Sequence, residues 1–306
     1  MMAYNNRLFL DAALIPLIKS EHVNQIVAVE GAWSPNCERQ RSEDGTIVGL
    51  EYFKNYSDIE FNSKLHVLYW DQIDPKTYRD YQCDRHEEIV CFGALLHRYY
   101  DPLALQQQLL ARDWGLREII RNIPKEEDDG WLWIVDSDEV YLPEQINQMV
   151  EFLEVVGDDH DMFAIQGKNF YFNGKQYHNE WYRRLFKIKE NCFFSDDNSL
   201  EVPRGNYLRT MNIPPEIVEF FHYGYCSEFR VKKKLEMWRQ DSVSKWWNQF
   251  GEMVANREKY DGSPVHLFGD KNPGYANYRL APYTGDHPES VKEILKCLEE
   301  HTKELP

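Results

Sequence analysis

The sequence lacks any apolar run approaching the roughly 20 residues that a helix needs to cross a bilayer. Residues 1–7 do not have the pattern of a signal peptide, and we expect no membrane span. The six cysteines are scattered and form no C-x-x-C pair, which argues against a zinc ribbon, a redox motif or a disulfide scaffold. We therefore expect reduced cysteines and a cytoplasmic location.

Basic residues are few relative to acidic ones: 35 Lys and Arg stand against 51 Asp and Glu, for a formal net charge of -16. This balance disfavours nucleic acid and anionic membranes as default partners, because both are polyanions. Hydrophobic residues make up 42% of the chain, enough for a sizeable packed core. The aromatic residues, at 14%, either pack this core or line a cleft that stacks on sugars or bases.

Helical and strand patterns alternate along the first half of the chain. Helices are predicted at 7–20, 101–122, 144–156 and 288–302, and strands at 25–30, 64–70, 131–135, 161–166 and 182–188. This alternation predicts an α/β domain over residues 1–225, with a mixed, mainly parallel sheet. Residues 226–306 are interpreted as a mostly helical C-terminal extension packed on that domain. Because ligands bind at the carboxyl ends of parallel strands, Glu30 and the acids after Val135 are expected in one crevice.

The most informative stretch follows the predicted strand 131–135, WLWIV. Asp136, Asp138 and Glu139 come within four positions, and carboxylates this close repel unless a cation or water separates them. Aspartates two residues apart at a strand end can turn toward one hard cation, and oxygen ligands suit Mg²⁺ or Mn²⁺. The alternative is a solvated loop whose Asp caps the next helix.

The stretch 131–143, WLWIVDSDEVYLP, resembles the metal-binding segment of the GT-A-fold glycosyltransferases, most closely that of inverting family two. Further pieces over residues 3–235 resemble that family in the same order: AYN at 3–5, VAVEG at 27–31, SEDGT at 42–46, ARDWG (a helix start in the family) at 111–115, RLFK at 184–187 and HYGY at 222–225. The resemblance implies a single GT-A (Rossmann-like) domain. It also implies sugar transfer from a nucleotide-sugar, first a UDP-sugar, with Mn²⁺ or Mg²⁺.

The resemblance also implies roles for particular residues. Asp136 and Asp138 would straddle the donor, with Asp138 as the direct metal ligand and Asp136 on the ribose or a metal-bound water. His222, which follows a predicted strand end, would complete the metal shell, although a hydrogen-bonded core histidine is the alternative. The remaining donor-site residues are Glu30, Asp44 and Arg112. A helix-capping or loop acid is the alternative for Glu30, and a surface salt bridge is the alternative for Arg112.

Inverting transfer needs a general base that deprotonates the acceptor hydroxyl. In the family this base comes from the region of the acid-rich segment 195–201, where we prefer Glu201 and then Asp197, with solvated loop acids as the alternative. A retaining enzyme would not need such a base, and the sequence leaves both outcomes open.

The acceptor is expected to be a saccharide or surface glycan. Segment 228–247 interleaves basic residues with Trp246 and Trp247, which suits either a solvated helix, a phosphate-binding lid or a nucleic-acid surface. A DNA glycosyltransferase acting on a hydroxymethylated base, as in phage-type DNA, is therefore an alternative. A metal-dependent nucleotide-sugar hydrolase is another. A nucleotidyltransferase is disfavoured because residues 31–45 contain only Gly31 and Gly45 and form no glycine-rich loop.

Overall fold

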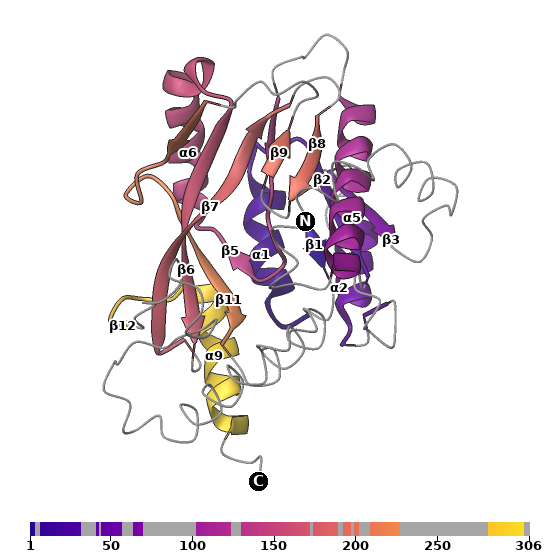
Figure 1. Cartoon of the computed structure of the whole chain (residues 1–306). Coiled ribbons are helices and arrows are strands. Elements are labelled where there is room, and N and C mark those ends of the chain that lie inside the picture. Colours follow the sequence, from indigo (N-terminus) through magenta and orange to yellow (C-terminus); the bar gives the residue numbers. More distant parts are fainter. Residues whose placement is uncertain are drawn as a thin grey trace.

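The computed structural model describes residues 1–3, 7–31, 41–42, 44–56, 64–69, 102–123, 130–171, 174–188, 192–196, 199–201, 209–226 and 281–302. Side chains are not described for 102–107, 193, 195–196, 199–201 and 301–302. These residues form a mixed α/β structure in which helices pack around strands (Figure 1). None of the described helices is both long and apolar enough to cross a membrane.

The N-terminal sheet is wholly parallel. It consists of β1 (Met2–Ala3), β2 (Ile26–Glu30) and β3 (Leu65–Tyr69), in the order β1-β2-β3. Its helices are α1 (Arg7–Lys19), α2 (Thr46–Tyr56) and α5 (Pro102–Asn122). Strand β2 is buried throughout, as its run of Ile, Val and Ala predicts. α5 packs closely on β2, because a Cβ at Gly115 would lie only 3.2 Å from Val29.

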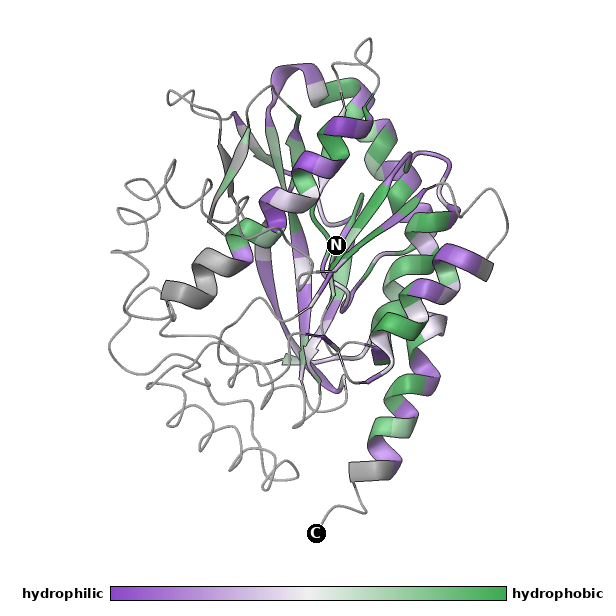
Figure 2. Ribbon diagram, turned by 90° about the vertical axis from the view of Figure 1, so that its right-hand side faces the viewer, coloured by the Kyte–Doolittle hydropathy of each residue, from purple (hydrophilic) through white to green (hydrophobic). Residues whose placement is uncertain are grey.

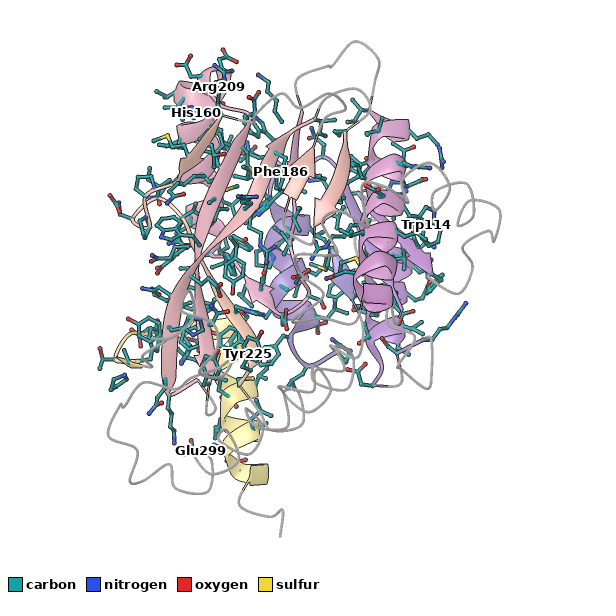
Figure 3. All side chains as sticks on the ribbon, in the orientation of Figure 1. Trp114, His160, Phe186, Arg209, Tyr225 and Glu299 are labelled. Atoms are coloured by element: carbon teal, nitrogen blue, oxygen red, sulfur yellow. The ribbon has the colours of Figure 1, made fainter. Side chains whose placement is uncertain are left out.

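The second sheet is mixed. Among the described strands its order is β12-β7-β6-β11-β5, with β4 paired to β7 and β10 paired to β6. The bounds are β4 (Trp131–Trp133), β5 (Glu139–Val140), β6 (Met162–Tyr171), β7 (Gln176–Lys187), β10 (Thr210–Asn212), β11 (Glu219–Tyr225) and β12 (Ala281–Pro282). A separate hairpin joins β8 (Phe193–Asp196) and β9 (Ser199–Glu201). Its Phe194 packs in one core cluster with Phe186 of β7, which Figure 3 labels at the level of this hairpin.

Among the described residues, one isolated parallel bridge joins the N-terminal sheet to the segment that follows β4. Met2 of β1 pairs with Asp136, three residues beyond β4. β4 is therefore followed by a segment that runs parallel to β1, β2 and β3, and the carboxyl ends of these strands lie at one edge. β1 has only two residues, yet it occupies the centre between β2 and Asp136.

The core lies between the sheets and the helices that cover them. One large cluster joins α1 and α6 (Pro143–Val156) to the strands through residues such as Leu14, Ile146 and Phe163. Figure 2 shows hydrophobic residues gathered on the inner strands, while the surrounding helices carry hydrophilic residues on their outer sides. A short 3-10 helix, η2 (Gly157–Asp159), follows α6.

The C-terminal helix α9 (Glu289–Thr302) packs on α1 and on the end of the mixed sheet. Gly174, in the turn between β6 and β7, has φ +81, and a Cβ there would lie 2.9 Å from both His287 and Leu295. Only glycine therefore fits this turn beneath the C-terminal segment.

Most predicted elements are confirmed. The four predicted helices correspond to α1, α5, α6 and α9 within two residues, and the five predicted strands to β2, β3, β4, β6 and β7. Two strands are longer than predicted: β6 ends five residues later and β7 begins six residues earlier. "Mainly parallel" holds for the N-terminal sheet only, since β7 pairs antiparallel with β4, β6 and β12. Residues 111–115 lie in the middle of α5 and not at a helix start. The expected helices over 228–260 fall on 227–280, outside the described residues.

Candidate functional site

The acidic cluster forms a tight turn at the junction of the two sheets. Glu139 N–H donates to the main-chain oxygen of Asp136 (3.0 Å), and Ser137 N–H donates to that of Met2 (3.2 Å). The Glu139 carboxylate closes the turn, because its Oε2 accepts from the main-chain N–H of Asp136 (3.2 Å). The Glu139 side chain thus fixes the backbone that carries Asp136.

Asp138 and His222 meet because β5 pairs antiparallel with β11. Glu139 lies opposite His222 in this pairing, and Tyr223 N–H donates to the main-chain oxygen of Asp138 (2.9 Å). As a result His222 Nε2 lies 3.6 Å from Asp138 Oδ1, and both residues are buried. His222 is in the middle of β11 and not at the predicted strand end, since the strand continues to Tyr225. Tyr225 is labelled in Figure 3 near α9.

Two guanidinium groups converge on Asp136. Arg112 Nη2, from α5, lies 3.4 Å from Asp136 Oδ1, and Arg184 Nη2, from β7, lies 3.6 Å from Asp136 Oδ2. Arg184 also forms a close ion pair with Glu139. Both arginines are buried, whereas the Asp136 side chain keeps 29% of its exposure. Asp136 is therefore held by buried charge while remaining open to a ligand.

Burial dominates the electrostatics of the Glu139–Arg184 pair. It raises the pKa of Glu139 to about 8, with Asp136 and Asp138 adding to the rise and Arg184 opposing it. Burial acts to lower the pKa of Arg184, but Glu139 and Asp136 outweigh it and hold that pKa above its ordinary value. Arg184 thus offsets part of the cost of burying the Glu139 carboxylate.

His222 is oriented by a buried amide. The side-chain oxygen of Asn169 lies within hydrogen-bond distance of His222 Nδ1 and accepts from the Tyr182 hydroxyl (2.9 Å). The amide nitrogen of Asn169 lies 3.3 Å from His178 Nε2. With the amide in this orientation, His222 carries its proton on Nδ1 and turns the lone pair of Nε2 toward Asp138.

A further carboxylate, that of Glu180 in β7, lies near Tyr182 and His178. Glu180 Oε2 is 2.7 Å from the Tyr182 hydroxyl and 3.7 Å from His178 Nε2. Burial acts to raise the pKa of Glu180, but the neighbouring His178 ring and Tyr182 hydroxyl hold it below its ordinary value. Glu180 is therefore ionised at neutral pH.

Glu30 and Asp44 both have structural partners. Glu30 is fully buried at the end of β2, and its Oε1 accepts from the main-chain N–H of Ser42 (2.8 Å). Asp44 accepts from the main-chain N–H groups of Thr46 (3.0 Å) and Arg7 (2.8 Å), and so ties together the first residues of α2 and α1. Their roles toward a nucleotide stay predictions.

The predicted base residues are described only in part. Glu201 ends β9, where it pairs with Phe193, but its side chain is not described. Asp197 and the basic segment 228–247 lie outside the described residues. The site brings together Asp136, Asp138, His222 and Arg112 of the predicted set, with Glu30 at the same strand edge.

Sequence reasoning missed three residues of the site: Arg184, Asn169 and Glu180. Arg184 was visible only as part of the family-like RLFK strand. The other two carried no local signal, because their place beside His222 depends on strand register across β6, β7 and β11. Glu139 was seen as a third acid, but its structural partner Arg184 lies 45 residues away.

Within the described residues, no group of three or more His, Cys, Asp and Glu side chains converges as a metal site. The side chains that could share a cation are the pair Asp138 and His222, while Asp136 is held by Arg112 and Arg184. No protein-family model matches the chain, and no curated protein matches it.

Proposed function

We propose that this chain is a metal-dependent glycosyltransferase that moves a sugar from a nucleotide-sugar donor to an acceptor hydroxyl. The observation that carries the proposal is the position of His222 of β11, which lies 3.6 Å from Asp138. Asp138 belongs to the turn that follows β4 and contains Asp136. The resemblance of residues 131–143 to the GT-A metal-binding segment supports the same function. On the proposed fold, the acids lie at the carboxyl edge of the parallel strands, where ligands bind in α/β sheets.

The side chains fit a hard divalent cation. Bonds of about 2.1 Å from a cation to each of two ligand atoms allow those atoms to be up to about 4.2 Å apart. The 3.6 Å between His222 Nε2 and Asp138 Oδ1 is within this limit. Two protein ligands leave the remaining positions of Mn²⁺ or Mg²⁺ for water and a substrate diphosphate.

The proposal assigns each residue a task. When bound, the cation neutralises charge on the leaving nucleoside diphosphate. Asp138 and His222 hold it, while Arg112 and Arg184 fix the orientation of Asp136 toward the ribose side of the donor. Buried Glu30, at the end of the neighbouring strand β2, lies on the same edge as Asp136 and is assigned to the nucleoside. Glu201 or Asp197 remains the proposed base of an inverting transfer, and a glycan the first acceptor.

The test is a thermal-shift panel of UDP-, GDP-, CDP- and dTDP-sugars with and without Mn²⁺. A ligand at about 100 times its dissociation constant stabilises the native state by about 2.7 kcal/mol. We expect one nucleotide-sugar to raise Tm only when Mn²⁺ is present, and Asp138→Asn to abolish that shift. Asp159→Asn, at an exposed position of η2, is the matched control and should keep it. A panel without any Mn²⁺-dependent shift would argue against the transferase.

A further inference from the structure

Arg184 reaches the acidic turn because of an irregularity in β7. Ala164 lies opposite Arg183 in the β6–β7 ladder, and Phe163 lies opposite Leu185. Arg184 is therefore the extra residue of a β-bulge, a feature that re-aims a side chain out of the regular alternation. Arg183 is exposed, whereas Arg184 is buried in the direction of the turn.

Two aromatic rings hold the guanidinium of Arg184 in place. Its Cζ lies 4.9 Å from the ring centroid of Tyr182 and 5.5 Å from that of Phe220, within the range of cation–π attraction. Gly167 makes room for both rings, since a Cβ there would lie 2.5 Å from Phe220 and 2.9 Å from Tyr182. The bulge and the two rings together orient the Arg184 side chain.

The Arg184 side chain points toward the acidic turn, residues 136–139. Arg184 pairs with one carboxylate oxygen of Glu139, and the other oxygen accepts from the main-chain N–H of Asp136. Glu139 also lies opposite His222 in the β5–β11 pairing. Arg184 therefore connects, through Glu139, to the backbone of the turn that places Asp138 against His222.

We propose that Arg184 is a positioning residue that acts through Glu139 to hold the 136–139 turn in the conformation in which Asp138 and His222 bind one divalent cation. The inference rests on the proposed function and deepens it. Arg184 itself contacts neither the cation nor the sugar. A planar guanidinium with several donors suits this role, because it can bind Glu139 and approach Asp136 together.

If the ion pair were purely structural, removing both of its charges would leave the Mn²⁺ affinity unchanged. Replacing both members of a buried ion pair with well-packed hydrophobic residues of similar volume is often neutral or stabilising, whereas removing one member leaves an uncompensated buried charge. The double variant Arg184→Met/Glu139→Gln removes both charges and keeps the volume. It therefore separates loss of positioning from loss of folding.

The experiment measures the affinity of the purified full chain for Mn²⁺ by electron paramagnetic resonance of the free ion, with unfolding followed in parallel. We expect the double variant to unfold at a Tm close to that of the unmodified chain and to bind Mn²⁺ about 10- to 100-fold more weakly, the usual effect of losing a group that orients a metal ligand. Arg184→Lys keeps the charge but loses the planar guanidinium, so its Mn²⁺ affinity should lie between those of the double variant and the unmodified chain.

The chain offers a matched control in α5. Exposed Arg121 and partly buried Glu118 form an ion pair there, and Arg121→Met/Glu118→Gln makes the same substitutions. This control should bind Mn²⁺ as the unmodified chain does. An unchanged Mn²⁺ affinity in the Arg184/Glu139 double variant would overturn the positioning role. Absence of Mn²⁺ binding by the unmodified chain, or binding unaffected by Asp138→Asn, would overturn the metal site itself.

Discussion

The two faces of β11 carry neighbouring residues with opposite tasks. His222 points to the face that holds Asp138, Asn169 and the acidic turn. Tyr223, the next residue, points to the other face, where its ring stacks on Phe9 and Phe170 at centroid distances of 5.0 Å. Its hydroxyl lies 2.9 Å from Nδ1 of His287, just before α9.

The comparison shows two ways of burying a strand. The Tyr223 face removes large aromatic surface from water, which stabilises the fold roughly in proportion to area. The His222 face buries charges, which costs free energy unless partners compensate it. We infer that the apolar contacts on one face of β11 offset part of the cost of the charges buried on the other.

The largest expected effect is a loss of stability when the Tyr223 face of β11 is disrupted. Phe170 is fully buried and contacts Tyr223, Tyr283 and His287. Phe170→Ala should lower the free energy of unfolding by about 3–5 kcal/mol, because it removes a large buried ring and leaves a cavity. Urea unfolding measures this change, and Mn²⁺ affinity below the transition should stay unchanged. Trp181→Ala, at a position of β7 that is 41% exposed, is the control.

A loss of Mn²⁺ affinity in folded Phe170→Ala would contradict the separation of the two faces. The ring would then matter to Asn169, its neighbour on β6, and the two faces of this sheet would form one coupled unit.

The second-largest expected effect comes from overpacking on the His222 face of β11. Gly167→Ala places a methyl group against the rings of Phe220 and Tyr182, which hold Arg184. We expect a loss of about 1–3 kcal/mol from overpacking, and also weaker Mn²⁺ binding because the guanidinium shifts. Gly130→Ala is the control, since a Cβ there would lie 3.6 Å from Ile188, an ordinary contact. Loss of stability with unchanged Mn²⁺ affinity would show that the rings do not set the position of Arg184.

The sequence predicted the elements whose own pattern decides their structure. The apolar runs of β2 and β4 and the periodic helices α5 and α6 needed no distant information. Helix α2 was not predicted, and its TIVGLEYFKNY sequence contains β-branched residues and Gly49. Its packing explains the glycine, since a Cβ at Gly49 would lie 2.9 Å from Leu10 of α1. Tertiary contact here outweighs helix propensity.

The same division applies to the site. Asp136 and Asp138 could be predicted because they directly follow an apolar strand. The tasks of Arg184 and Asn169 could not, because one depends on a bulge in β7 and the other on the parallel register of β6 with β11. Register is set by the whole sheet, and a single sequence shows a bulge only as an ordinary residue.

The smallest expected effect is a pH dependence of stability that arises on the Tyr223 face of β11. His287 Nε2 lies 3.1 Å from the main-chain oxygen of Gly174, which can only accept, so Nε2 carries the proton and Nδ1 accepts from the Tyr223 hydroxyl. Burial lowers the pKa of His287 below its ordinary value of 6.5, against the opposing effects of the Gly174 hydrogen bond and Asp286. The neutral ring is thus the form that the folded chain favours.

The sign of the effect follows from linkage. As pH falls through the ordinary histidine pKa, the unfolded chain takes up a proton at His287 before the folded chain does, so stability is present above that pH and falls below it. Between about pH 7.5 and about pH 5.5, a range that brackets this pKa, the unmodified chain should lose more Tm than His287→Gln. Equal losses would show that His287 is protonated without cost. The pH dependence would then come from the other face of β11 or from elsewhere, and docking of the C-terminal segment would be insensitive to the charge of this ring.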